Sequence, residues 1–95
     1  MENCMVGMFA SSKAGHDKRK VYIIIKEETE YVYLADGICK TLVKPKKKSK
    51  KHIQIIKKNA DETLRQKLLD GEVLRDEEIK HALKQYRQYL NGNKI

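Results

Sequence analysis

The chain has 95 residues, of which 21 are Lys or Arg and 13 are Asp or Glu, so its formal net charge at pH 7 is +8. This length suffices for one domain with a modest core, and such a basic chain favours polyanions, either nucleic acid or an anionic membrane surface. No window approaches the roughly 20 apolar residues that span a bilayer. Glu2 also stands where a signal peptide carries cations. We therefore expect a cytoplasmic protein with no membrane partner.

Five short apolar runs in the first sixty residues predict five β-strands. They lie at residues 6–11, 21–25, 31–35, 38–43 and 52–56. The second run is rich in β-branched residues, and the pair Asp36 and Gly37 favours a tight hairpin between the third and fourth runs. Short strands joined by tight turns are typical of a small barrel. We expect residues 1–58 to form this five-stranded barrel.

Two basic segments interrupt the predicted strands. The first, residues 12–20, has a turn-forming glycine, Gly15, close to an aspartate that can hydrogen-bond locally. The second, residues 44–52, is rich in lysine and contains Pro45, the only proline of the chain. Proline and the repulsion of like charges predict a mobile loop there until an anion binds, and lysine-rich loops neutralise backbone phosphates.

The last third of the chain, residues 59–95, has the periodicity of a helical hairpin. Asn59 and Glu62 have the spacing of a capping box, which predicts a helix over residues 60–69 that ends before Gly71. Asp76 and the two acids after it indicate the start of a second helix. The apolar stripes consist of Leu64 and Leu68 in the first helix and of Ile79, Ala82, Leu83, Tyr86 and Leu90 in the second. Both stripes require an apolar surface to cover them, and we expect the barrel to supply it.

Three sequence blocks in a fixed order resemble the KOW-domain RNA-binding proteins, which are similar to KOW-type proteins of the large ribosomal subunit. The blocks are residues 12–18 with the aliphatic strand after them, residues 34–37 and residues 44–48, and the resemblance covers roughly residues 6–56. It implies a mainly β protein with an SH3-like barrel that binds RNA, most often ribosomal RNA, through its loops. The helical hairpin lies outside this resemblance.

Within the first block, Gly15 resembles the glycine of the KOW turn, and Asp17 with Lys18 resembles the polar pair after it. His16 stands where the family often has arginine, and Arg19 where glycine is common. Charge and resemblance together predict an RNA-binding surface made by the two basic segments. Its residues are Lys13, Gly15, His16, Lys18, Arg19, Lys20, Lys44, Lys46, Lys47, Lys48, Lys50 and Lys51.

No catalytic constellation appears, so we expect a non-enzymatic protein associated with the ribosome or translation, without a small-molecule substrate. Cys4 and Cys39 are isolated, and the three histidines are scattered, whereas a structural metal takes about four ligands, usually in close pairs. We expect reduced thiols, no metal and no cofactor. Tyr31 and Tyr33 share one strand face and either stack on RNA bases or pack in the core.

Two alternative functions remain open at this level. The first is a protein-interaction module that meets a partner through the apolar stripe of the second helix or through a groove of the barrel. The second is a nucleic-acid-binding protein of transcription, since KOW domains also occur in transcription elongation factors.

Overall fold

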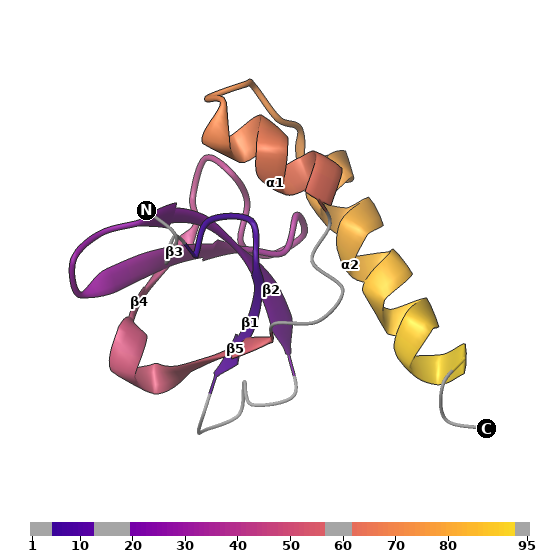
Figure 1. The fold of residues 1–95 in the computed structure, drawn as a ribbon, viewed down its shortest axis with the longest axis horizontal. Helices are drawn as coiled ribbons and strands as arrows, with labels where there is room; N and C mark the ends of the chain where they lie inside the picture. Colours follow the sequence, from indigo (N-terminus) through magenta and orange to yellow (C-terminus); the bar gives the residue numbers. More distant parts are fainter. Residues whose placement is uncertain (1–4, 13–19, 57–61, 93–95) are drawn as a thin grey trace.

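A five-stranded antiparallel sheet with two α-helices makes up the described part of the chain, residues 5–12, 20–56 and 62–92 of a computed structural model (Figure 1). In chain order the elements are β1 (Phe9–Ser12), β2 (Val21–Glu27), β3 (Tyr31–Ala35), β4 (Lys46–Ser49), the 3₁₀ turn η1 (Lys50–His52), β5 (Ile53–Ile56), α1 (Glu62–Leu69) and α2 (Asp76–Gly92). Side chains of α2 are described as far as Gln88. The mixed β and α composition that the sequence predicts is confirmed.

The sheet is strongly curled but not closed. Its strand order is β4-β3-β2-β1-β5, so the two edge strands are consecutive in the chain and are joined only by the three residues of η1. Five flat strands would hold their edges about 19 Å apart, whereas a three-residue 3₁₀ turn rises about 6 Å. The edges must therefore approach each other at η1. Among the described strands β4 and β5 are not paired, so the five-stranded barrel expected from the sequence is not closed.

Two hydrophobic clusters lie on opposite faces of this sheet. The inner cluster consists of Ala10, Tyr22, Ile24, Val32, Leu34 and Ile53. The outer cluster joins the sheet to the helices and consists of Phe9, Ile23, Ala35, Leu64, Ile79, Ala82, Leu83 and Tyr86. Within it the rings of Phe9 and Tyr86 have centroids 4.7 Å apart. Alternation along the strands divides the apolar residues between the faces, because successive side chains point to opposite sides.

The helices form as the sequence predicts, and both pack on the outer face. Leu64 is buried and Leu68 packs against the outer cluster, while every described residue of the second stripe is buried there. Gly71 has φ +75°, and the backbone N–H groups of Gly71 and Glu72 donate to Leu68 and Lys67. These two bonds satisfy carbonyls at the end of α1 and make a Schellman motif. The predicted cap residue Asn59 lies outside the described residues.

The strand predicted at residues 38–43 is wrong. Asp36 and Gly37 do form a tight turn, with Gly37 at φ +79° and the Asp36 carboxylate accepting from the N–H groups of Ile38 and Lys40. The chain then leaves β3 instead of pairing with it, and the N–H of Leu42 donates to Asp76 Oδ1 at 2.8 Å. This segment is therefore attached to the start of α2.

On the side away from β2, β3 pairs with β4, which lies in the segment predicted to be a mobile loop. Residues 46–49 pair with β3 over its first four residues, so the loop prediction is wrong for them. Like-charge repulsion is reduced because alternate lysines point to opposite faces of the strand. A lysine-rich sequence also suits an edge strand, where charge discourages pairing with another chain.

Candidate nucleic-acid interface

The predicted RNA-binding residues fall into a described and an undescribed group. The undescribed group contains Lys13, Gly15, His16, Lys18 and Arg19, which lie in segment 13–19. The described group contains Lys20, Lys44, Lys46, Lys47, Lys48, Lys50 and Lys51. The part of the predicted common surface that the first basic segment supplies therefore lies outside the described residues, except for Lys20.

The points where the first basic segment leaves and re-enters the sheet are described. Ser12, which precedes segment 13–19, is paired with Ile53 of β5, and Ile53 directly follows η1. Ser11 is paired with Val21, so Lys20 and the start of β2 are at the same end of the sheet. Figure 1 shows the end of β1 and η1 on the same lower side of the molecule. Strand pairing thus brings the start of one basic segment beside the end of the other.

The lysines of β4 do not form one continuous patch. Lys46 and Lys48 pair with Leu34 and Val32, whose side chains belong to the inner cluster, so these two lysines extend from the inner side of the strand. Lys47 extends from the outer side. The three consecutive lysines of β4, all predicted to belong to one RNA-binding surface, are therefore divided between two faces. This division is a consequence of the two-residue period of a strand.

Lys50 is engaged within the protein. Its Nζ donates to Glu27 Oε2 at 2.7 Å, and both side chains are less than a third exposed. Glu27 Oε1 also accepts the backbone N–H of Met5 at 2.9 Å. The hydrogen bond from Lys50, then that from Met5, holds the pKa of Glu27 below its ordinary value of 4.5. Lys50 therefore contributes to the fold, whereas the next residue, Lys51, is exposed.

Two tyrosines and two lysines form an aromatic and basic surface on the outer face, beside the area that the helices cover. Tyr33 faces Lys26 of β2 and Lys47 of β4, with their Nζ atoms 5.4 and 5.9 Å from its ring centroid. Lys47 Nζ is also 4.6 Å from the ring centroid of Tyr31. The hydroxyl of Tyr33 donates to Glu28 Oε2 at 3.2 Å. Cations at such distances from aromatic faces are attracted by the ring quadrupole. We call these four residues, Lys26, Tyr31, Tyr33 and Lys47, the tyrosine–lysine surface.

Lys26 is a member of this surface that the sequence prediction missed. The register between β2 and β3 shifts between Ile24 and Lys26, so that Lys26 and not Ile25 is opposite Tyr33. A β-bulge of this kind turns a side chain to the other face of the strand. Nothing in the sequence marks the bulge, although the shared face of Tyr31 and Tyr33 was predicted correctly.

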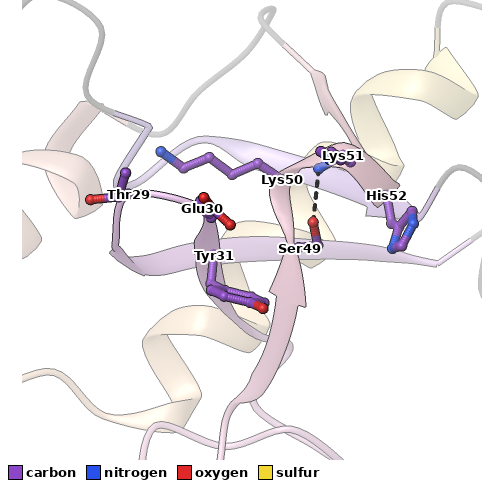
Figure 2. A pocket seen from close by; sticks show the side chains of 7 residues that line it. All are labelled: Thr29, Glu30, Tyr31, Ser49, Lys50, Lys51 and His52. Atoms are coloured by element: carbon purple, nitrogen blue, oxygen red, sulfur yellow. Dashed lines mark hydrogen bonds between the residues drawn. The ribbon is translucent and has the colours of Figure 1, made fainter.

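A hollow of about 570 Å³ lies at the end of the tyrosine–lysine surface. Its lining residues are Thr29, Glu30, Tyr31, Ser49, Lys50, Lys51 and His52. Figure 2 shows the ring of Tyr31 on one side of the hollow and the residues of η1 across from it. The backbone N–H of Lys50 donates to the carbonyl of Glu30 at 3.0 Å, and that of Lys51 to Ser49 Oγ at 3.3 Å. The first bond holds η1 against the turn between β2 and β3, and the second caps the start of η1.

The comparisons with known proteins add no relative, because no family model and no curated protein matches the chain. In the described ranges no helix has the length and apolar character needed to cross a membrane. The same residues contain no group of three or more His, Cys, Asp or Glu that could hold a metal ion. Cys39 is an exposed free thiol.

Proposed function

We propose that this protein is a non-enzymatic, cytoplasmic RNA-binding protein that binds structured RNA, ribosomal RNA above all, through its basic segments. The pairing of Ser12 with Ile53 carries the proposal, since it joins the start of the first basic segment to the end of the second. The exposed Lys51 and His52 lie directly before that pair. A surface that combines separate cationic segments suits a phosphate backbone, which supplies most of the affinity in such complexes.

We further propose that the curled sheet, with β4 and β5 unpaired, is an open form of the SH3-like barrel of the KOW type. The strand order, with β1 between β2 and the last strand, and the 3₁₀ turn between β4 and β5 support this assignment. So does the sequence resemblance over residues 6–56. The two helices are then an addition to the KOW unit that covers its outer face.

The alternative of a partner protein held by the apolar stripe of α2 has little support from the structure. Ile79, Ala82, Leu83 and Tyr86 are all buried against the sheet and α1, so this part of the stripe is already occupied. The side chain of Leu90 lies outside the described residues. Among the described helix residues, the faces of α1 and α2 that remain accessible to a partner carry mainly charged and polar side chains.

The test measures RNA affinity against salt concentration for two matched double variants. Lys47→Gln with Lys51→Gln removes two cations from the proposed site, and Lys80→Gln with Lys84→Gln removes two exposed cations from α2. The first variant should reduce the slope of log K against log salt by roughly 0.7 to 0.9 for each lost phosphate contact. The second should leave it close to that of the parent protein.

The outcomes separate the remaining alternatives. Equal slopes for both variants would contradict the proposed site, and an absence of binding to ribosomal RNA fragments would contradict the function. Competition with duplex DNA at physiological salt addresses the transcription alternative, since a DNA-binding protein would release its RNA at equal DNA concentration. Association with ribosomes in a pull-down should be lost after nuclease treatment, whereas a complex with a protein partner should survive it.

A further inference from the structure

The hollow beside Tyr31 has the size and lining of a site for one nucleotide. Its volume of about 570 Å³ falls in the range of roughly 300 to 1,000 Å³ that is usual for small-molecule sites. It offers an aromatic ring, a carboxylate and a cation within one concavity, supplied by Tyr31, Glu30 and Lys51. None of these groups is required for the phosphate-backbone contacts proposed above, except Lys51.

Tyr31 is the group of this hollow that suits a nucleobase. Its side chain is exposed, with 41% of the residue's surface accessible, and it stands at the first residue of β3, next to the turn between β2 and β3. Lys47 Nζ lies over the ring, 4.6 Å from its centroid. Tyr31 also lines the hollow. Tyr33 differs, because it is half-buried, has lysines on both sides and is bonded to Glu28. Bases stack on exposed aromatic side chains of this kind in single-stranded RNA recognition.

Charge divides the hollow into two parts. Lys51 is exposed and can meet a phosphate, whereas the ammonium of Lys50, which also lines the hollow, is held by Glu27. Glu30 is exposed and its carboxylate is only an acceptor of hydrogen bonds when ionised. It repels phosphate and favours a base edge with hydrogen-bond donors. Guanine presents two adjacent donors, N1–H and the N2 amino group, to a carboxylate, while uracil presents a single one.

We propose that this hollow binds one unpaired guanosine of an RNA loop or bulge, with the base stacked on Tyr31, its donor edge at Glu30 and its phosphate at Lys51. The inference rests on the proposed RNA-binding function and adds the class of RNA to it. A base inside a duplex cannot reach the ring, so the site selects RNA with an extruded nucleotide. The backbone contacts supply affinity, and this hollow supplies selectivity.

The experiment compares four RNA hairpins that differ only in one bulged nucleotide, G, A, C or U, with a fully paired hairpin of the same length. Affinities are measured by fluorescence anisotropy for the parent protein and for Tyr31→Leu, Tyr31→Phe and Glu30→Gln. Tyr31→Leu should weaken binding of the G-bulge hairpin by about 5- to 100-fold, with an unchanged salt slope. Tyr31→Phe should retain most of the affinity, because its ring still stacks. Binding of the paired hairpin should be the same for the parent protein and the two Tyr31 variants.

The parent protein should bind the G bulge more tightly than the U bulge, and Glu30→Gln should reduce that difference. Equal affinity of the parent and Tyr31→Leu for the G bulge would overturn the stacking site. Equal affinity of the parent protein for the G and U bulges would overturn the role of Glu30. In both cases salt-dependent binding to the paired hairpin would leave the proposed function intact. If the parent protein binds none of the hairpins or ribosomal RNA fragments, the proposed function itself fails.

Circular dichroism of each variant checks that the sheet is retained. We expect it to be retained, since Tyr31 is outside both hydrophobic clusters.

Discussion

Lys50 of η1 and Glu27 of β2 form an ion pair at 2.7 Å that links two segments 23 residues apart in the sequence. The pair fastens the 3₁₀ turn against the sheet at the point where the chain passes from one edge strand to the other. Two consecutive lysines, Lys50 and Lys51, consequently have different tasks. One stabilises the curled sheet, and the other belongs to the proposed RNA-binding surface.

Replacing each of these lysines by methionine should separate stability from binding. Lys50→Met leaves Glu27 without its partner in a partly buried position and should lower the free energy of unfolding by about 1 kcal/mol. Lys51→Met should leave the free energy of unfolding within about 0.5 kcal/mol of the parent value and weaken RNA binding. Urea denaturation and a salt titration of RNA affinity measure the two effects. The reverse pattern would show that Lys50 is the RNA-binding residue.

The lowered pKa of Glu27 predicts a loss of stability in acid. A carboxyl group with a lower pKa in the folded than in the unfolded state stabilises the fold when ionised. This contribution is complete above the unfolded value of about 4.5 and is lost as the pH falls below it toward the folded value. Lys67 lowers the pKa of Glu78 in the same direction. Thermal unfolding between pH 6 and pH 3 should show a smaller decrease for Glu27→Gln than for the parent protein. An identical decrease in both proteins would exclude Glu27 as a cause.

Two glycines with positive φ offer a matched test of the contact between α1 and the N-terminal turn. Gly7 has φ +88°, and a Cβ added there would lie 2.4 to 2.7 Å from atoms of Arg65 that include its Cα. Gly71 has φ +75° and open space around it. Gly71→Ala should therefore cost about 1 to 2 kcal/mol through backbone conformation alone. Gly7→Ala should cost about 1 to 3 kcal/mol more, because α1 must move. Similar midpoints in urea would indicate that α1 adjusts freely.

The attachment of residues 38–43 to α2 can be tested with two acids of the same helical turn. Asp76 and Glu77 both lie in the first turn of α2, so both interact favourably with the helix dipole. Only Asp76 accepts the N–H of Leu42, at 2.8 Å. Asp76→Ala should lower the free energy of unfolding by about 1 to 2 kcal/mol more than Glu77→Ala. Hydrogen exchange at the Leu42 amide should become faster in the first variant alone, and equal exchange would contradict the attachment.

Local sequence patterns were sufficient to predict the strands and helices whose apolar residues repeat with the period of the element. The β-branched run at Val21 and the alternation of Tyr31 to Ala35 predicted β2 and β3, since one strand face must be apolar for burial. The spacing of Ile79, Ala82 and Leu83 predicted the buried face of α2 for the same reason. The separation of sheet and helices along the chain followed from the change in period near residue 59.

The fourth strand illustrates where local patterns fail. Residues 38–43 are more apolar than residues 46–49, and by propensity they are the better strand. Asp36 nevertheless turns the chain away from β3. The backbone N–H of Leu42 then donates to Asp76 of α2, and its side chain packs against the outer cluster. The edge of β3 is then left to a lysine-rich segment. Residues 38–43 can contact either α2 or β3, and only the tertiary structure decides which of the two they contact.

The candidate site shows the same division between sequence and tertiary structure. The amino-acid sequence by itself determined the cationic character of the chain, the clustering of lysines after residue 43 and the common face of the two tyrosines, because charge and side-chain alternation are local properties. Tertiary structure decided which cations are available. The register of β4 divides its lysines between two faces, the bulge in β2 brings Lys26 to Tyr33, and Glu27 holds Lys50. Each of these depends on the pairing of segments far apart in the chain, for which a single sequence carries no local signal.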